Sequence, residues 1–484
     1  MPQDFSDLAA DVIDARRCTV EMPAGTGKTQ LLVMVADLLV KRGGMVLVLT
    51  HTNAGVAAIK QRCSKLEVPS QGVRVMTVTS WTEMVVTSYP KASAMQGRLR
   101  GWKDNEYFNN VVRGATTLLG QEWFRRVVAA SYQAVLVDEY QDCSLLQHRL
   151  VVALGDTLGS VTCFGDPLQR IFDFSGEQFP RWNDVVKTFP LFKGVVPYPH
   201  RWVKGNFELG EWLTYDLRNN IASSIASGNT FTLAAETFPS NMKVFGGTES
   251  PQDQINRAYR LANLQGDSLI ICPNQPPKAA ERFAKCVGKR YRYPEEVEAK
   301  FIRANVEKYI VAKNGGNLGE WLVSLIKECT CGANSALDKT VCRALYEGRP
   351  IDKYLAAQNR RSYEGLLTAI YMFVQAPGMD SLRDVDAALK VSPSTTFRLE
   401  AWRGTLRTIV EYERTGTDPE EILRTVREKL RFGGGRFSGN IVSRTLLVKG
   451  LEFPNVMVIN ANTGYTNENL YVALTRACNQ LWIS

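Results

Sequence analysis

Residues 23–29 have the composition of a loop that binds phosphate groups. They read PAGTGKT, follow the apolar segment 17–22 and precede a helical stretch, residues 30–41. Glycines let backbone N–H groups close on phosphate oxygens, and the N-terminus of the following helix adds positive potential. We expect Lys28 to pair with the β- and γ-phosphates of ATP, and the Thr29 hydroxyl to hold Mg²⁺. The other predicted ATP-binding positions are Ala24, Gly25, Thr26 and Gly27.

A pair of carboxylates, Asp138 and Glu139, comes at the end of the aliphatic segment 134–138. We expect Asp138 to hold the metal through water and Glu139 to take a proton from an attacking water molecule. An acidic pair after a strand is also common as a helix N-cap. Gln141 and Asp142 directly after the pair, and the phosphate loop upstream, favour ATP hydrolysis.

Short apolar runs rich in Val, Ile and Leu must position these groups. Helical stretches separate them, which is typical of buried parallel strands in an α/β sheet. Four runs lie in the N-terminal half and three bracket a long interval, so the sequence predicts two α/β lobes. The runs are residues 17–22, 45–50, 134–138, 160–165, 268–272, 455–460 and 480–484.

Each lobe is expected to carry a mainly helical insertion. The first insertion mixes aromatic with basic residues, which could stack bases and hold phosphates or simply form a small helical domain. The second has periodic helical segments at residues 319–328, 361–374 and 417–430, and its cysteines at 329, 331 and 342 lack a fourth metal ligand. The predicted parts are residues 1–83 plus 131–200 (first lobe), 84–130 (first insertion), 201–275 plus 441–484 (second lobe) and 276–440 (second insertion).

Composition limits the class of protein. A chain of 484 residues is too long for one compact core, and its net charge of +9 suits contact with phosphate backbones. The three histidines exclude a zinc hydrolase of the HExxH type. Scattered cysteines, the absence of a secretory leader and the absence of a membrane-spanning apolar run predict a cytoplasmic protein without a membrane partner.

Taken in order, the motifs resemble those of superfamily 1A helicases of the UvrD, Rep and PcrA type. The resemblance covers both lobes and fades in the insertions. It implies two RecA-like P-loop NTPase lobes with parallel sheets, and use of ATP and Mg²⁺. The matching stretches are LTHTNA at residues 49–54, DEYQD at 138–142, GDPLQRIFDFSG at 165–176, PHR at 199–201, KGLEFP at 449–454 and YVALTRA at 471–477.

Roles for further residues follow from that resemblance. Gln169 resembles a residue that senses the γ-phosphate and couples it to DNA contact. Arg201 and Arg476 resemble arginines that reach the γ-phosphate from the second lobe, where charge builds in the transition state. Glu452 resembles a ribose contact, and His200 stands where an aromatic residue stacks on adenine. The implied nucleic-acid contacts are His51, Thr52, Asn53, Thr79, Phe172, Phe174 and Lys449.

Some positions depart from the family pattern. These departures are expected to affect base preference and the strength of DNA binding rather than ATP hydrolysis. Met22 replaces the first glycine of the strict phosphate-loop pattern, His51 a phenylalanine, Leu446 and Leu447 a polar pair, and Ser175 an arginine, while Gln3 is the sole, poorly spaced candidate for the adenine-reading glutamine.

These observations favour an ATP-dependent translocase or helicase that moves 3′ to 5′ along single-stranded or tailed DNA. An alternative is a DNA-sensing ATPase that regulates a partner nuclease and unwinds little. The short first insertion is similar to compact UvrD-like proteins such as the helicase-like subunit of the Gabija antiphage system, which work with a nuclease. A motor directed by RNA is a third reading.

Overall fold

The computed structural model describes residues 4–95, 105–171, 178–233, 238–239, 242–245, 250–276, 278–294, 299–432 and 437–484. Contacts divide the chain into two compact units. The first unit comprises Met1–Met242, Lys449–Glu452 and Tyr465–Gln480. The second unit comprises Lys243–Val448, Phe453–Gly464 and Leu481–Ser484. The four-part division expected from the sequence stays a prediction.

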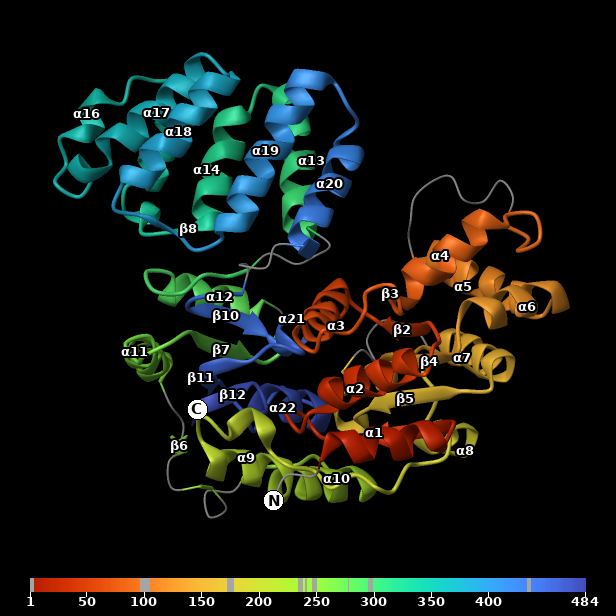
Figure 1. Cartoon of the computed structure of the whole chain (residues 1–484). Helices are drawn as coiled ribbons and strands as arrows, with labels where there is room; N and C mark the ends of the chain where they lie inside the picture. Colours follow the sequence, from red (N-terminus) through yellow and green to blue (C-terminus); the bar gives the residue numbers. More distant parts are fainter. Residues whose placement is uncertain are drawn as a thin grey trace. The chain divides into compact units, whose positions relative to one another are not determined.

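A five-stranded parallel sheet forms the centre of the first unit (Figure 1). Its strand order is β1-β5-β4-β2-β3. Connections therefore leave the neighbouring strands β4 and β2 in opposite directions. Open α/β sheets bind ligands beside such a point, at the carboxyl ends of their strands. The strands are β1 (Arg17–Glu21), β2 (Val46–Thr50), β3 (Val73–Thr77), β4 (Ala134–Val137) and β5 (Val161–Gly165).

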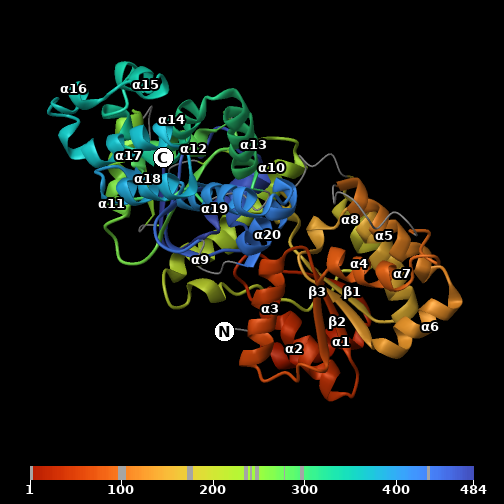
Figure 2. The same cartoon turned by 90° about the horizontal axis from the view of Figure 1, so that it is seen from above.

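Successive side chains of these strands point to opposite faces of the sheet and pack into two hydrophobic cores, one on each face. Leu47 and Leu49 of β2 pack with the first group of helices, whereas Val46 and Val48 pack with the second. The two groups lie on opposite faces in Figure 2. The first group is α4 (Val78–Ser88), α5 (Asn105–Leu119), α6 (Glu122–Ser131), α7 (Leu145–Leu158) and α8 (Trp182–Thr188); the second is α1 (Phe5–Asp14), α2 (Lys28–Lys41) and α3 (Asn53–Lys65).

The second unit contains another five-stranded sheet, with order β10-β7-β11-β12-β6. Its residue pairings along β10–β7, β7–β11 and β12–β6 are parallel. Helices α11 (Pro251–Leu261) and α12 (Ala279–Val287) pack on it through a core that includes Tyr291 and Trp482. The strands are β10 (Ile441–Arg444), β7 (Ser268–Cys272), β11 (Phe453–Val458), β12 (Ala477–Ile483) and β6 (Lys243–Val244).

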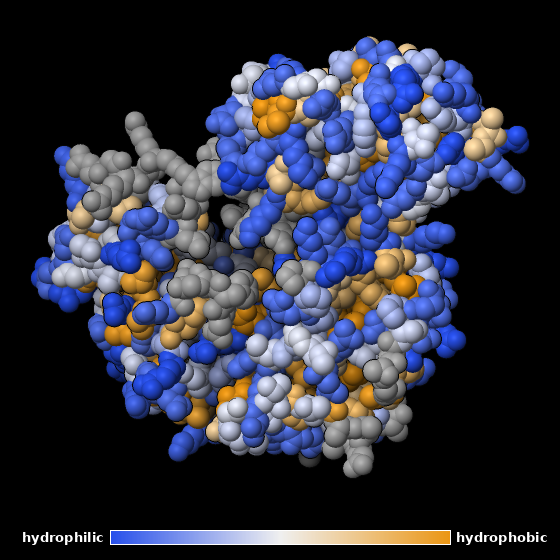
Figure 3. Space-filling model, turned by 180° about the vertical axis from the view of Figure 1, so that it is seen from behind, coloured by the Kyte–Doolittle hydropathy of each residue, from blue (hydrophilic) through white to orange (hydrophobic). Residues whose placement is uncertain are grey.

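Besides this sheet and the short helix α21 (Thr445–Val448), the second unit contains a helical subdomain. Its own core includes Trp321, Phe373 and Trp402, and the face seen in Figure 3 is mainly hydrophilic with scattered apolar residues. A two-stranded antiparallel ribbon, β8 (Thr330–Cys331) with β9 (Thr395–Thr396), joins its helices. These are α13 (Lys300–Gly315), α14 (Leu318–Cys329), α15 (Lys339–Tyr346), α16 (Asp352–Leu355), α17 (Glu364–Gln375), α18 (Met379–Val391), α19 (Leu399–Thr415) and α20 (Pro419–Phe432).

The predicted α/β fold with two parallel sheets and helical insertions is confirmed. All seven predicted strands exist, with ends shifted by up to three residues, and α14, α17 and α20 match the three predicted helical segments. Strands β3, β6, β8, β9 and β10 were missed. No described group of three or more His, Cys, Asp or Glu residues could hold a metal, which includes the cysteines at 329, 331 and 342. Within the described ranges, no helix has the length and apolarity to cross a membrane.

Candidate nucleotide site

The phosphate loop runs from the end of β1 to the start of α2. Gly25 and Gly27 have φ angles of +74° and +98°, which L side chains rarely adopt. A Cβ at Gly25 would lie 2.5 Å from the Trp202 ring, and one at Gly27 would lie 2.6 Å from the Phe5 ring. Both glycines are therefore required by conformation and by space. The loop leaves the first N–H groups of α2 without partners inside the helix, as an anion site requires.

Lys28 and Glu139 are paired beside the loop. The Lys28 Nζ donates to the Glu139 Oε2 at 2.8 Å, and the Gln141 Nε2 donates to the same oxygen at 2.5 Å. Burial alone would raise the pKa of Glu139, but the Lys28 and Lys449 ammonium groups outweigh it and lower the pKa. Glu139 is therefore a carboxylate at neutral pH, as a general base requires.

Asp138 lies at the end of β4 with only 4% of its surface exposed, and its Oδ1 has no hydrogen-bond partner among the described residues. Burial and the neighbouring Glu139 carboxylate raise its pKa, although Lys28 opposes the shift. Buried carboxylate oxygens of this kind suit Mg²⁺, which takes few protein ligands and keeps several waters. Asp138 and the Thr29 hydroxyl fit such a site, with water and phosphate oxygens completing the coordination.

Asp166, at the end of β5, connects several predicted site residues. It is fully buried. Its Oδ2 accepts from the Gln169 Nε2 at 2.9 Å, and its backbone N–H donates to the Gln141 Oε1 at 3.0 Å. Gln141 thus bridges Asp166 and the Glu139 carboxylate. Gln169 is therefore linked to Glu139, the predicted base, by hydrogen bonds through Asp166 and Gln141.

Arg201 and Arg476 lie together in the first unit, which also contains the phosphate loop. The Arg201 N–H donates to the Gly25 carbonyl at 3.0 Å, and its guanidinium donates to the Thr475 carbonyl at 2.6 Å. Arg201 Nε also lies 2.9 Å from Glu452 Oε1, an ion pair without hydrogen-bond geometry. The Glu452 side chain is 49% exposed, so it remains available to another ligand.

The Arg476 side chain is buried, with 1% of its surface exposed. It donates to the Val472 and Leu451 carbonyls and to the Thr475 hydroxyl. No carboxylate within the described chain forms an ion pair with it. Burial, together with the Arg201 charge, lowers its pKa to about 9, while Glu452 and Glu139 act in the opposite direction. Because a buried cation without an anionic partner is energetically unfavourable, binding of an anion beside Arg476 would stabilise it.

Two aromatic rings, Phe5 and His200, lie next to the loop, and Tyr198 packs against His200. The His200 ring centroid is 5.2 Å from that of Phe5 and 4.9 Å from that of Tyr198. His200 belongs to the predicted adenine site, whereas Phe5, the first residue of α1, was missed. A lone phenylalanine at the start of a helix carries no signal for base stacking. Gln3 lies outside the described residues.

The predicted nucleic-acid contacts have mixed surroundings. The His51 Nε2 lies 3.5 Å from the Cys143 Sγ. Burial and the Lys449 charge lower the pKa of His51 to about 4, although the residue is not fully buried. Thr52 caps α3, which begins at Asn53, and Thr79 accepts from Thr82. Phe172, Phe174 and Ser175 lie outside the described residues.

Lys449 is held inside the first unit. Its Nζ lies 2.7 and 2.5 Å from the two carboxylate oxygens of Asp142, and 2.7 Å from the Gln169 carbonyl. The side chains of the pair are 9% and 6% exposed. In this conformation the charge of Lys449 is used within the protein, and its contact with DNA stays a prediction.

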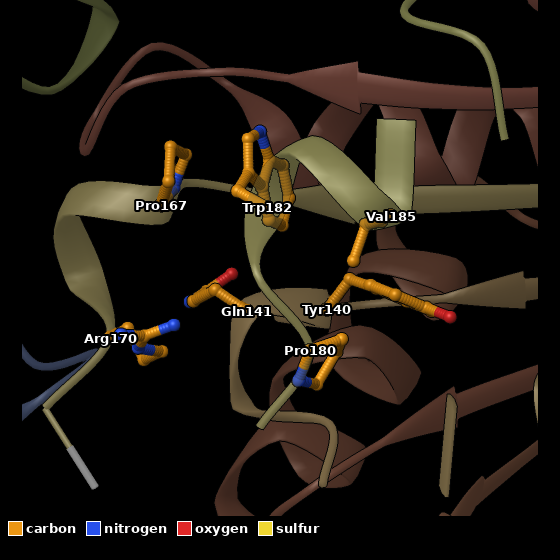
Figure 4. Close-up of a pocket in the computed structure, with 7 residues that line it drawn as sticks. All are labelled: Tyr140, Gln141, Pro167, Arg170, Pro180, Trp182 and Val185. Atoms are coloured by element: carbon orange, nitrogen blue, oxygen red, sulfur yellow. The ribbon is translucent and has the colours of Figure 1, made fainter. Parts of the chain in front are cut away.

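A small pocket adjoins the Glu139 network. It encloses about 250 Å³, including space open to solvent. Figure 4 shows the Gln141 amide between Trp182, Arg170 and Pro180. Gln141, which bridges Glu139 and Asp166, thus lies at the wall of this pocket although it is only 4% exposed. Its lining is Tyr140, Gln141, Pro167, Arg170, Pro180, Trp182 and Val185.

These features together are those of a P-loop nucleotide-binding protein: a glycine-rich loop between strand and helix, a following lysine, and a carboxylate pair after β4, which β5 separates from β1. Comparison with known proteins narrows the class. Residues 102–190 match the model of the UvrD/REP helicase N-terminal domain. The chain is similar there to superfamily 1 helicases.

Among solved structures, the chain matches the Pif1 helicase from Candida albicans. The identity is 13%, the match covers 55% of this chain and 56% of that one, and the TM-score is 0.27. The chain thus spans about half the length of that helicase, and a TM-score this low carries no argument about function. No curated protein matches the chain.

Proposed function

We propose that the protein hydrolyses ATP and uses the free energy to move along single-stranded DNA in the 3′ to 5′ direction. ATP is bound with its phosphates on residues 24–29 and its base beside His200. Bound Mg²⁺, held by Asp138 and Thr29, supplies charge neutralisation on the phosphates. The family match supports the helicase class, and the resemblance of the motifs supports the polarity.

Glu139 accepts a proton from the water that attacks the γ-phosphorus. The bond between the γ-phosphorus and the bridging oxygen breaks, so ADP and phosphate leave. Lys28 lies 2.8 Å from Glu139, and the γ-phosphate competes for the same ammonium group. Its arrival loosens that ion pair and leaves Glu139 oriented by Gln141.

The observation that carries the proposal is the state of Arg476. Its guanidinium is buried beside Arg201, without a carboxylate partner among the described residues, and the Glu139 charge acts on its pKa. Such a cation is suited to the charge that develops on a transferring phosphoryl group. Arginines in this role are worth about 10³–10⁵ in kcat.

ATP turnover by matched variants tests this function. Lys28→Ala and Glu139→Gln are expected to abolish DNA-stimulated turnover, and Arg476→Met to lower kcat by about 10³-fold. Lys41→Ala is the control, because Lys41 ends the same helix and its side chain is 66% exposed. Wild-type activity in the first two variants would refute the site. Strand displacement on tailed duplexes then tests movement, with RNA as a separate arm.

Two observations favour a second function, in which the ATPase senses DNA and controls a partner nuclease with little unwinding. Lys449 is engaged by Asp142, and apolar Leu446 and Leu447 stand where polar residues contact DNA in the helicase family. Both features reduce the grip on a strand. ATPase activity stimulated by DNA, without displacement of any tailed duplex and with co-purification of a nuclease, would select this function over translocation.

A further inference from the structure

Arg218 lies in α10 (Asp216–Ala226), in a segment that completes the first unit with α9 (Phe207–Thr214) and α22 (Asn467–Leu474). Its side chain is only 13% exposed. One guanidinium nitrogen lies 2.8 Å from the Glu21 Oε1, and the other lies 2.6 Å from the Asp166 Oδ1. The second nitrogen also lies 3.3 Å from the Tyr471 hydroxyl. No sequence motif marks Arg218.

The two carboxylates belong to neighbouring parallel strands. Glu21 ends β1 and is in register with Gly165, the residue before Asp166. Parallel strands thus bring two acids to one edge of the sheet, and Asp166 is fully buried there. A planar guanidinium bonds both at once, which an ammonium group does less well. Removing it would leave a buried carboxylate beside a second one, both without their cation.

Arg218 also reaches both halves of the candidate site through one intermediate each. Asp166 holds Gln141, which holds the Glu139 carboxylate. The Tyr471 hydroxyl accepts from the Ala24 N–H of the phosphate loop at 3.3 Å. The described partners of Arg218 are Glu21, Asp166 and Tyr471. Arg218 thus holds residues that contact the site without belonging to the site itself.

We propose that Arg218 is a positioning residue for ATP hydrolysis. It fixes the ends of β1 and β5 so that Gln141 orients the base and Tyr471 orients the loop. This inference rests on the proposed function. A purely structural ion pair would change stability, whereas a positioning residue changes kcat more than nucleotide affinity, because small displacements of reacting groups are costly in rate.

Three variants test the proposal in the full-length protein: Arg218→Lys, Arg218→Met and Arg181→Met. Arg181 is the control, since its side chain is 84% exposed and pairs with Asp184 on the surface. The readouts are kcat and KM for ATP with single-stranded DNA, the Kd of a fluorescent ATP analogue, and the melting temperature. Arg218→Met is expected to lower kcat about 10- to 100-fold with Kd changed less than about threefold. Arg218→Lys should recover part of kcat.

Each outcome decides the matter. Kinetics of both Arg218 variants equal to those of Arg181→Met would overturn the proposal. The proposal would also be overturned if Arg218→Met lost affinity for the ATP analogue and kcat by similar factors. If Arg218→Met does not fold, Arg218→Lys decides alone: lower kcat at near-native melting temperature and Kd supports positioning, and unchanged kcat refutes it. A wild-type protein that binds the ATP analogue without hydrolysing ATP would instead refute the proposed function itself.

Discussion

Replacing Gly25 by alanine tests whether the phosphate loop and Trp202 pack as described. The residue has φ +74°, and its new Cβ would lie 2.5 Å from Cζ3 and 2.7 Å from Cη2 of Trp202. The ring cannot easily move, because it is fully buried and its Nε1 donates to the Ala477 carbonyl at 2.6 Å. The left-handed conformation costs an alanine about 1–2 kcal/mol. Overpacking adds about 1–3 kcal/mol.

Gly159→Ala is the matched control. Gly159 has φ +70°, but no atom lies within 4 Å of the position that an alanine Cβ would take, so this variant carries the conformational cost alone. The free energy of unfolding should therefore fall by about 1–2 kcal/mol in Gly159→Ala and by about 2–5 kcal/mol in Gly25→Ala. Only Gly25→Ala should lose affinity for a fluorescent ATP analogue.

Urea denaturation followed by tryptophan fluorescence measures both stabilities, and titration of the analogue measures affinity. Both variants place an alanine at positive φ, so the comparison isolates the close contacts at Gly25, which are with Trp202 and, at 3.0 Å, with the Arg201 Cβ. Equal stabilities of the two variants, or native affinity in Gly25→Ala, would show that the loop does not pack against Trp202 as described.

Three further positions, each tested by substitution, probe charges in the first unit: His51, the Lys449–Asp142 pair and Glu139. The pKa of His51 is lowered to about 4 in the folded protein, so folding favours the neutral ring, and the stability that this gives above the unfolded pKa near 6.5 is lost as the pH falls. From pH 7 to pH 5 the free energy of unfolding should fall by about 1–2 kcal/mol. Urea denaturation curves of His51→Phe should lack this pH dependence. Lys449→Met should cost about 3–5 kcal/mol by leaving Asp142 buried without its cation, and adding Asp142→Asn should restore most of this in thermal melts. Glu139→Gln should retain nucleotide affinity in a binding titration while turnover is lost; retained turnover would exclude Glu139 as the base.

Local patterns explain most of what could be predicted. The central strands are continuous apolar runs because helices cover both faces of the sheet, and the phosphate loop is one contiguous segment. Strand β3 was missed because Arg74 and other partly exposed residues interrupt its apolar pattern. Its position beside β2 at the sheet edge permits that exposure.

Contacts between residues that are far apart in the sequence could not be predicted from local sequence patterns. Arg218 meets Glu21 across 197 positions of sequence and Asp166 across 52. Neither α10 nor the end of β1 has a composition that indicates a partner. The same holds for Phe5 beside His200, and for the Lys449 ammonium group, whose buried pairing with Asp142 spans 307 positions. Such contacts depend on the fold being complete, and sequence spacing alone does not fix them.

The distribution of charge around the site points to what it binds. Most buried ionic groups there are matched: Lys449 with Asp142, Arg218 with Glu21 and Asp166, Arg201 with Glu452, and Lys28 with Glu139. Within the described residues, two groups are left over: the Asp138 Oδ1, which lacks a donor or cation, and the Arg476 guanidinium, which lacks an anion. Buried charges without partners are costly. Under the proposed function, a magnesium–triphosphate complex would bring a cation to Asp138 and an anion to Arg476, so one ligand would satisfy both.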